Sequence, residues 1–490
     1  MTVPLSQANL TALPESVAAP GYDRAALTPG ILHFGVGNFH RAHQAMYLDR
    51  LFAQGQSLDW ALVGAGVFEG EKKGRAVLQA QDWLTTLVEQ EADHSTARVL
   101  GSMIDYLEPA DAPAIIARMT QADIRIVSLT ITEGGYFLDS KDRFDPTHPA
   151  IVADAVSPAS PKTAFGMMIA ALKARRAAGT PPFTVMCCDN IPHNGVVTRN
   201  ALCGLARLSD PGFADWIAAN VAFPNAMVDR ITPATGDRER AILAQDFGVQ
   251  DGWPVFCEGF TQWVLEDNFP LGRPQLEAVG AQFVDDVAPF ELMKLRILNG
   301  GHAVIAYPAG LMDIHFVHEA MEHPLIRAFL HKIEQTEIVP QVPPVPDTNL
   351  PAYVSLIERR FSNPKIGDTV RRLCLDGSNR QPKFIIPTLR DALKNGGAYS
   401  GLALECALWA RYCAGVTDSG ATIDPNDPNW DRLVPVAQQA RRRPQAWLEQ
   451  DAIYGDLAEH AGFAAQFAHW LHRLWQDGTA KTLTRYVESG

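Results

Sequence analysis

Residues 31–37 read ILHFGVG, and residues 38–55 continue as NFHRAHQAMYLDRLFAQG. The first piece is a short apolar run that ends in glycines, and the second has helical character. Two glycines at the tip of a first strand allow a tight turn and the close approach of a pyrophosphate to a helix N-terminus. The stretch therefore predicts the opening strand, turn and helix of a dinucleotide-binding domain. His40 replaces the third glycine of the usual fingerprint, so an ordinary strand-to-helix turn is the alternative.

Apolar runs and helical patterns alternate through the next 150 residues. Such alternation is typical of βαβ units and a parallel sheet. We expect further strands at Trp60–Val67, Asp123–Thr132 and Phe183–Asn190, and helices at Glu71–Gln81 and Pro161–Gly179.

The character of the sequence changes near residue 285. Long Ala- and Leu-rich helical patterns then dominate, and irregular polar or proline-rich pieces separate them at 339–351 and 417–430. We expect an α/β domain over residues 1–285 and a mainly α-helical domain over residues 286–490. The helical patterns cover residues 289–306, 316–337, 385–394, 399–414 and 455–474.

Composition limits the kind of protein. The chain has 490 residues, more than one core usually holds, and its net charge of −13 argues against nucleic-acid or anionic-membrane binding. The seven cysteines show no metal-ligand spacing, which predicts reduced thiols in a cytoplasmic protein. The N-terminus lacks a signal-peptide pattern, and no run of 18 apolar residues suggests a membrane span. We expect no metal at the histidines near the glycine turn, because no carboxylate or cysteine partner lies nearby in the sequence.

The apolar helix predicted over 289–306 contains three polar side chains. At about 100° per residue, His302 lies about 80° and Asn299 about 140° from Lys294 around the helix axis. An unpaired amine in such surroundings tends to have a lowered pKa, which would make Lys294 a usable general base. The alternative is that Lys294 and Arg296 only reach solvent from the edge of a packed helix.

Acidic residues follow the second predicted strand. A carboxylate there would hydrogen-bond the adenosine ribose and favour NAD over NADP. Glu69 and Glu71 are both suitably placed, and we expect NAD. Lys72, Lys73 and Arg75 follow closely and could instead meet a 2′-phosphate.

Polar residues also end the other buried strands. Cofactor and substrate meet at the carboxyl ends of strands in open α/β sheets. Asn190 is therefore a candidate hydrogen-bond donor to a reacting oxygen, and Glu133 a candidate acid or relay. A turn or cap role is the alternative for each residue.

Six stretches together resemble the polyol-specific long-chain dehydrogenase/reductase family. They are GVGNFHRAHQA (35–45), IRIVSLTITEGGY (124–136), FTVMCCDNIPHNG (183–195), FPNAMVDRITP (223–233), QWVLEDNF (262–269) and MKLRILNGGH (293–302). The resemblance implies a Rossmann-type NAD-binding domain, a helical C-terminal domain and metal-independent hydride transfer in the cleft between them. It also implies D-mannitol and D-fructose as the polyol and ketose, acting at C2, and leaves a monomer open.

The resemblance assigns roles residue by residue. Lys294 matches the catalytic lysine, Asn190 and Asn299 match asparagines that hold the reacting oxygen, and His302 matches a histidine that orients substrate. The remaining matches are the sugar contacts Asp229, Arg372 and Arg380, the proton-relay acids Glu133 and Glu291, the NAD-preference acid Glu71, and the cofactor loop Phe34, Gly35, Val36, Gly37, Asn38 and Phe39. Arg380 stands where a lysine is expected.

Other functions remain open from the sequence. Sorbitol, D-arabinitol and xylitol dehydrogenases are close alternatives within the family. Fructuronate and tagaturonate reductases are another, because Arg372 or Arg380 could bind a substrate carboxylate. A dinucleotide-binding regulator without turnover would need the glycine turn but not the lysine, the two asparagines and the histidine together.

Overall fold

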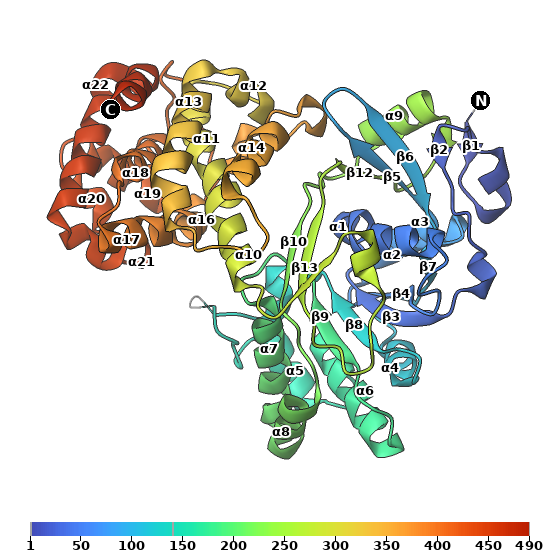
Figure 1. The fold of residues 1–490 in the computed structure, drawn as a ribbon. Coiled ribbons are helices and arrows are strands. Elements are labelled where there is room, and N and C mark those ends of the chain that lie inside the picture. The colour runs from blue at the N-terminus through green and yellow to red at the C-terminus, as the bar shows by residue number, and fades with distance from the viewer. Residues whose placement is uncertain (1, 140–141, 490) are drawn as a thin grey trace. The chain divides into compact units, whose positions relative to one another are not determined.

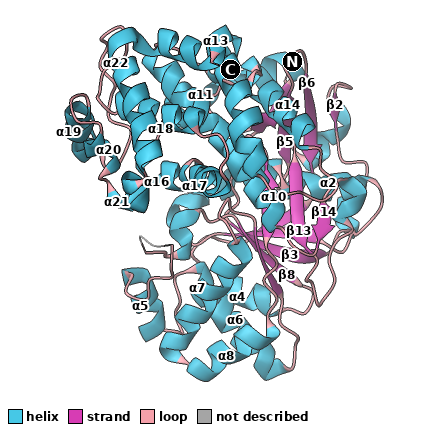
Figure 2. Cartoon of the chain, turned by 60° about the vertical axis from the view of Figure 1, so that its left-hand side comes forward, coloured by secondary structure: helices cyan, strands magenta, loops and turns pink. Residues whose placement is uncertain are grey.

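The computed structural model describes residues 2–139 and 142–489. They form two compact units, Met1–Ala288 (unit 1) and Pro289–Gly490 (unit 2). All fourteen strands of the described chain lie in unit 1, whereas unit 2 is built from helices (Figures 1 and 2). None of the described helices combines the length and the hydropathy needed to cross a membrane.

A five-stranded parallel sheet forms the centre of unit 1. Its order across the sheet is β7-β4-β3-β8-β9. Among these five strands, the chain order is therefore third, second, first, fourth, fifth, which is the Rossmann arrangement. The predicted fold class is confirmed. The strands are β3 (Pro29–Phe34), β4 (Ala61–Ala65), β7 (Met103–Tyr106), β8 (Ile126–Leu129) and β9 (Thr184–Cys187).

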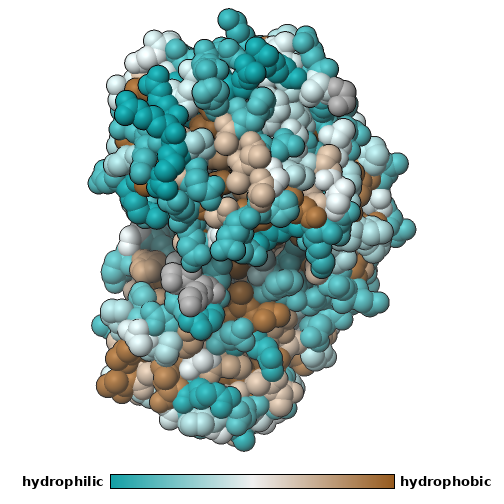
Figure 3. All heavy atoms as spheres, turned by 90° about the vertical axis from the view of Figure 1, so that its left-hand side faces the viewer, coloured by the Kyte–Doolittle hydropathy of each residue, from teal (hydrophilic) through white to brown (hydrophobic). Residues whose placement is uncertain are grey.

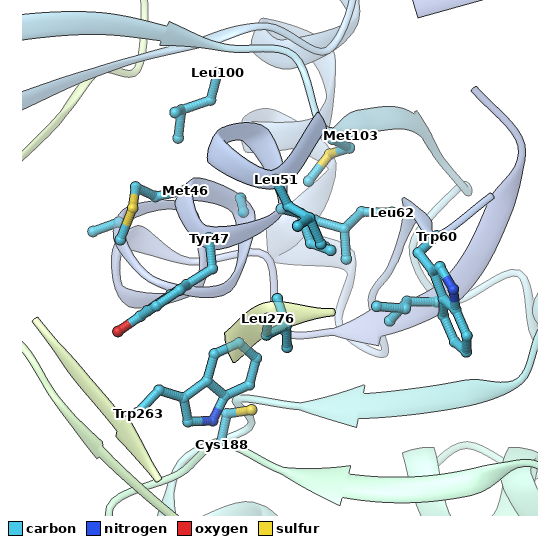
Figure 4. Close-up of a cluster of buried hydrophobic side chains, with 14 of the residues drawn as sticks. Met46, Tyr47, Leu51, Trp60, Leu62, Leu100, Met103, Cys188, Trp263 and Leu276 are labelled. Atoms are coloured by element: carbon cyan, nitrogen blue, oxygen red, sulfur yellow. The ribbon is translucent and has the colours of Figure 1, made fainter. Parts of the chain in front are cut away.

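Each face of this sheet packs against its own hydrophobic core. Because successive side chains of a strand point to opposite faces, Ile31 belongs to one core and Leu32 to the other. The first core includes helix α2 (Gln44–Ala53), where Tyr47 lies 5.3 Å from Trp263 between ring centroids (Figure 4). The second core includes helices α4 (Ala112–Thr120), α6 (Ala164–Ala178) and α7 (Asn194–Ser209).

Four strands end level with one another. Phe34 of β3 pairs with Ala65 of β4 and with Leu129 of β8, and Leu129 pairs with Cys187 of β9. The residues that follow these four ends therefore share one edge of the sheet. The glycine turn, Glu71, Glu133 and Asn190 all lie in the segments that begin there.

The other strands form smaller sheets around the central one. They make a four-stranded sheet β12-β5-β6-β2, a three-stranded sheet β10-β13-β14 and the pair β1-β11. Their bounds are β1 (Val3–Pro4), β2 (Val17–Ala18), β5 (Thr85–Gln90), β6 (Ser95–Leu100), β10 (Ala226–Asp229), β11 (Val249–Gln250), β12 (Val255–Glu258), β13 (Gln262–Glu266) and β14 (Gln282–Val284).

The helices predicted at Glu71–Gln81 and Pro161–Gly179 are present as α3 (Lys72–Ala80) and α6. Helix α6 begins after Thr163, whose hydroxyl accepts the N–H of Gly166 at 3.0 Å, and ends at Gly179 with φ of 70°. Some apolar side chains of α5 and α7 are exposed, and Val156 of α5 is 78% exposed. Figure 3 shows exposed hydrophobic side chains, in brown, on the lower part of the molecule. The remaining helices are α1 (Asn38–Ala42), α3 (Lys72–Ala80), α5 (Pro149–Val156), α8 (Pro211–Asn220) and α9 (Asp237–Phe247).

Unit 2 differs from its predicted helices in one important place. The helix expected over 289–306 consists of α10 (Ala288–Met293), a π-helix η6 (Lys294–Asn299) and α11 (Gly300–Leu311). Hydrogen bonds in a π-helix join residues five apart, so the regular 100° spacing used for this stretch does not hold within η6. A second π-helix, η7 (Glu334–Ile338), packs against η6.

Further helices of unit 2 surround α11. The predicted pattern at 316–337 becomes two helices and η7, and the proline-rich piece before residue 351 ends in a helix that was not expected. The helices are α12 (Val317–Glu322), α13 (Pro324–Ile333), α14 (Leu350–Phe361), α15 (Val370–Leu373), α16 (Gly377–Phe384), α17 (Ile386–Asn395), α18 (Ser400–Tyr412), α19 (Trp430–Ala440), α20 (Gln445–Leu448), α21 (Asp451–Tyr454) and α22 (Ala461–Glu488).

Candidate active site

The glycine turn after β3 combines one crowded glycine with one open glycine. Gly35 has φ of +92°, and a Cβ there would lie 2.1 Å from the carbonyl oxygen of Thr130. A Cβ on Gly37 would have its nearest neighbour 3.8 Å away. Gly35 thus lets β3 and β8 approach, whereas Gly37 leaves room above the turn. This open backbone at the β3–β8 switch point fits a bound pyrophosphate.

Contacts with the protein interior hold the other residues of the turn in place. Phe34 and Val36 are buried, Asn38 donates to the carbonyl of Pro233 at 3.3 Å, and the ring of Phe39 stacks on that of His43 at 4.9 Å. The helix expected to run on from residue 38 stops at Ala42 and restarts at Gln44, because His43 has a non-helical backbone (φ −121°, ψ −91°). The continuous helix was therefore wrong.

Two stacked histidines lie beneath the turn. The rings of His33 and His40 are 3.5 Å apart, and His33 contacts the hydroxyls of Ser128 and Thr130 at 2.8 and 2.9 Å. Burial lowers the pKa of His33 to about 3 and also lowers the pKa of His40, so both rings are neutral. No group of three potential metal-ligating side chains occurs among the described residues.

Glu71 lies folded against the end of β4. Its carboxylate accepts the N–H of Phe68 at 2.8 Å, and burial raises its pKa while this bond opposes the rise. Two of the three competing cations are already paired: Lys72 lies 2.6 Å from Glu69, and Arg75 lies 3.1 Å from Glu108. The carboxylates at this strand end favour a ribose hydroxyl over a phosphate.

The loops after β8 and β9 are tied together by Asp189. Its two carboxylate oxygens accept the N–H groups of Ile131 (2.9 Å) and Thr132 (3.0 Å) and the hydroxyl of Tyr136 (2.6 Å). The adjoining residues Glu133 and Asn190 are exposed at this edge. The structure thus brings these two predicted residues to neighbouring loops of one sheet edge.

Asn194 extends this connection to β10. Its fully buried amide donates to the carbonyls of Asp189 at 3.1 Å and Ala226 at 2.7 Å, and its oxygen accepts the N–H of Ala226 at 2.9 Å. Strand β10 begins at Ala226 and ends at the predicted site residue Asp229, which is 5% exposed.

In unit 2, the π-helix begins at Lys294 and ends at Asn299. Lys294 is 7% exposed, and Glu291 lies one turn earlier with the same exposure. Arg296 is buried as well and binds the carbonyl of Gln341 and the carboxylate of Asp391. The alternative that these cations reach solvent from a helix edge is therefore wrong. π-Helical segments occur frequently at functional sites.

Two buried polar atoms of η6 and the start of α11 have no hydrogen-bond partner within the described part of the chain. They are Oδ1 of Asn299 and Nε2 of His302. The His302 ring stacks on Phe361 at 4.1 Å and 19°, which fixes its plane. Burial lowers the pKa of His302 well below its usual value, so the ring is neutral. Unpaired buried polar atoms of this kind suit a polar ligand.

The positive charges of three guanidinium groups lower the pKa of His302 further. They belong to Arg372, Arg360 and Arg380. Arg372 binds Asp368 in a bidentate pair, and Arg380 donates to the carbonyls of Arg372 and Leu373 at 3.2 and 3.1 Å. The predicted sugar contacts of unit 2 thus lie close to the predicted substrate-orienting histidine.

The sequence reasoning missed several residues that hold these side chains in place. Tyr136, Asp189 and Asn194 do so in unit 1. Phe361 does so in unit 2, where the charge of Arg360 also acts on His302. The position of Asp189 directly before Asn190 at a strand end was the one visible signal, because polar residues there face the site edge.

The sheet order and the open glycine turn define a Rossmann-type protein with an added helical domain. Models of the mannitol dehydrogenase Rossmann domain and of the mannitol dehydrogenase C-terminal domain match residues 29–278 and 286–475. The chain belongs to the mannitol dehydrogenase family.

Individual relatives agree with this assignment. The chain is 60% identical to mannitol 2-dehydrogenase of Cereibacter sphaeroides over 473 residues, covering 96% of this chain and 99% of that one. It is 43% identical to Pseudomonas fluorescens mannitol 2-dehydrogenase in a ternary complex with NAD and D-mannitol, with a TM-score of 0.88 and full coverage of both chains. It is 35% identical to a substrate-free D-sorbitol dehydrogenase, with a TM-score of 0.92, covering 98% and 100% of the two chains.

Proposed function

We propose that this protein is an NAD-dependent mannitol 2-dehydrogenase that interconverts D-mannitol and D-fructose. One observation carries the proposal. A buried π-helix begins at Lys294 and ends at Asn299, shortly before His302, and the atoms Asn299 Oδ1 and His302 Nε2 have no hydrogen-bond partner among the described residues. A polyol offers hydroxyl groups that can both donate to and accept from such atoms. The relatives named as mannitol 2-dehydrogenases support the choice of polyol.

The Gly35–Gly37 turn would hold the pyrophosphate of NAD, and Glu71 its adenosine ribose. NAD, when bound, supplies the acceptor for the hydride that leaves C2 of the polyol. Burial of Lys294 favours the neutral form of an amine, which can accept the proton of the C2 hydroxyl. In the reverse direction, the same amine in its ammonium form protonates the alkoxide formed from the ketose.

Two asparagines stabilise the developing alkoxide in this proposal. In keeping with the family resemblance, Asn190 and Asn299 donate N–H groups to it, and each donor is worth about 3 kcal/mol. His302, held neutral and stacked on Phe361, orients the neighbouring hydroxyl.

Other polar residues complete the proposed machinery. Glu291 lies one helical turn before Lys294, and we assign it and the exposed Glu133 to the passage of the proton to solvent. Asp229, Arg372 and Arg380 contact the distal hydroxyls of the sugar. Seven free cysteines support our further proposal of a cytoplasmic enzyme.

The test is the oxidation of NADH, followed by its absorbance, with D-fructose, fructuronate and xylulose in turn, and then with NADPH. We expect D-fructose with NADH to give the highest kcat/KM. Turnover of fructuronate in preference to fructose would reassign the substrate, and NADH binding without turnover of any ketose would favour a regulator.

The base is tested by Lys294→Ala. General-base catalysis is worth about 10²–10⁴-fold, so kcat/KM should fall by that factor and recover partly with small amines. Lys332→Ala is the control, because the Lys332 amine donates to the carbonyl of Tyr486 at 2.7 Å and lies outside the proposed machinery. A near-normal kcat/KM in folded Lys294→Ala would remove the lysine from this role.

A further inference from the structure

The carboxylate of Asp189 is directed entirely at one neighbouring segment. Its three donors, at residues 131, 132 and 136, all belong to the turn after β8. The side chain is 8% exposed, and Tyr136 is fully buried. Asp189 therefore offers both oxygens to the protein and not to a ligand.

The turn that it holds has an unusual backbone. Thr132 has φ of 62° and ψ of 168°, a region that is essentially restricted to glycine and is a marked departure for a β-branched residue. Phe137, at the other end of this turn, is also left-handed, with φ of 54°. Such strain persists only where surrounding contacts fix the backbone, and the Thr132 N–H is one of the two that Asp189 accepts.

We propose that Asp189 is a positioning residue whose carboxylate fixes the turn carrying Glu133 against the loop carrying Asn190. Thr132 directly precedes Glu133, and Asp189 directly precedes Asn190. One side chain therefore sets the distance and direction between a proposed proton-relay acid and a proposed alkoxide donor. The inference rests on the proposed function, which gives those two residues their roles.

The charge of Asp189 is consistent with this role. Burial raises its pKa to about 6, and the Tyr136 hydroxyl and the two backbone N–H groups oppose that rise, while the nearby Glu133 carboxylate adds to it. Tyr136 also contacts the Cys187 thiol at 2.8 Å. At neutral pH the ionised carboxylate can accept all three hydrogen bonds.

A second aspartate of unit 1 accepts a similar set of hydrogen bonds, but it lies in a part of the chain to which we assign no role in the reaction. Asp154 accepts the N–H groups of Lys162 (2.8 Å) and Thr163 (2.9 Å) and the hydroxyl of Thr163 (2.6 Å), and it is 3% exposed. It has the same number and kinds of donor as Asp189, but it joins α5 to α6. Asp154→Asn is therefore a matched control for Asp189→Asn.

The experiment measures kcat, KM for D-fructose, the Kd of NADH and Tm for the full chain and both variants. We expect the same loss of about 2–4 °C in Tm from each variant. In Asp189→Asn, kcat should fall about 100-fold, as a displacement of about 1 Å at a reacting group can cause, while KM and Kd change less than about threefold. In Asp154→Asn, kcat should stay normal.

Thr132→Gly tests whether Asp189 acts through the turn. Glycine adopts the left-handed backbone without strain. The double variant Thr132→Gly/Asp189→Asn should therefore have a kcat at least about tenfold higher than that of Asp189→Asn alone. A side chain that only supported stability would give no such recovery. If Asp189→Asn does not fold, Tyr136→Phe replaces it, with an expected fall in kcat of about tenfold.

The outcomes separate the two proposals. Absence of turnover in the wild type would refute the proposed function. Wild-type turnover with equal kcat in Asp189→Asn and Asp154→Asn would overturn only the role of Asp189. Failure of Thr132→Gly to restore kcat, or a normal kcat in Tyr136→Phe where that variant replaces Asp189→Asn, would overturn it as well.

Discussion

Alanine substitution at two adjacent glycines at the start of α11 should change the stability of the protein in opposite directions. A Cβ on Gly301 would lie 2.8 Å from Oε1 of Glu334 and 3.4 Å from the ring of Phe361. A Cβ on Gly300 would meet nothing nearer than 3.5 Å, the carbonyl oxygen of Phe384. Gly300→Ala is therefore an internal control for Gly301→Ala.

The magnitudes follow from helix propensity and packing. Alanine is favoured over glycine in a helix by about 1 kcal/mol, and Gly300 has helical angles (φ −62°, ψ −45°). Overpacking costs about 2 kcal/mol when the neighbours are fixed, and Glu334 is fully buried. We expect Gly300→Ala to gain about 1 kcal/mol and Gly301→Ala to lose about 1 kcal/mol, equivalent to about 2–4 °C in Tm in each direction.

The effect on activity comes through Phe361. Its ring stacks on His302 and would lie in van der Waals contact with the new methyl at 3.4 Å, so the repacking forced by the 2.8 Å contact with Glu334 also reaches the imidazole. We expect kcat/KM for D-fructose to fall at least about tenfold in Gly301→Ala and to change less than about twofold in Gly300→Ala. Calorimetry and NADH oxidation measure the two effects. Equal Tm values with normal activity in both variants would refute this reasoning.

Two further predictions concern unit 1. Because burial lowers the pKa of His33 from 6.5 to about 3, the unfolded chain binds a proton that the folded chain excludes, and the stability present above pH 6.5 is lost as the pH falls. Urea titrations should therefore show that the unfolding free energy falls by about 2 kcal/mol less between pH 7 and pH 5 in His33→Asn than in the wild type. An equal fall in the two proteins would contradict this. Glu71→Ser should raise the ratio of kcat/KM with NADPH to that with NADH at least about tenfold, because the carboxylate that repels a 2′-phosphate is gone. Glu319→Ser removes the same kind of cap, to Phe316 at 2.9 Å, and should leave this ratio unchanged, whereas equal ratios in both variants would exclude Glu71 from cofactor choice.

The Rossmann core was predictable because its signals are local and repeated. The runs that became β3, β4, β8 and β9 are almost continuously buried, as a parallel sheet covered on both faces requires. Their ends, and hence the edge carrying Glu133 and Asn190, follow from that order. Strands β10 to β14 have no comparable signal, because their segments lack such long apolar runs. Pro224 and Asn225 directly precede β10, for example, and Pro254 directly precedes β12.

The π-helix could not be read from the sequence. An apolar stretch keeps the same composition whether its hydrogen bonds join residues four or five apart, so Lys294–Asn299 carries no distinct pattern. Its neighbours decide the outcome: Arg296 binds groups near residues 341 and 391, far along the chain. The role of Asp189 was only partly visible. Its place at a strand end pointed to the site edge, but two of its three donors are backbone N–H groups, which no residue type marks.

The strand pairings of unit 1 have a consequence for the order in which the chain folds during synthesis. Val3 pairs with Val249, Leu87 pairs with Val255, and Trp263 packs on Tyr47. The helices on the other face come from residues much nearer in sequence to their strands. Helices can therefore pack on one face of the sheet early, whereas the core around α2 can form only after about residue 281 has left the ribosome. A nascent chain halted before β12 exposes the apolar face of α2, and this is the interval in which chaperone binding should be strongest.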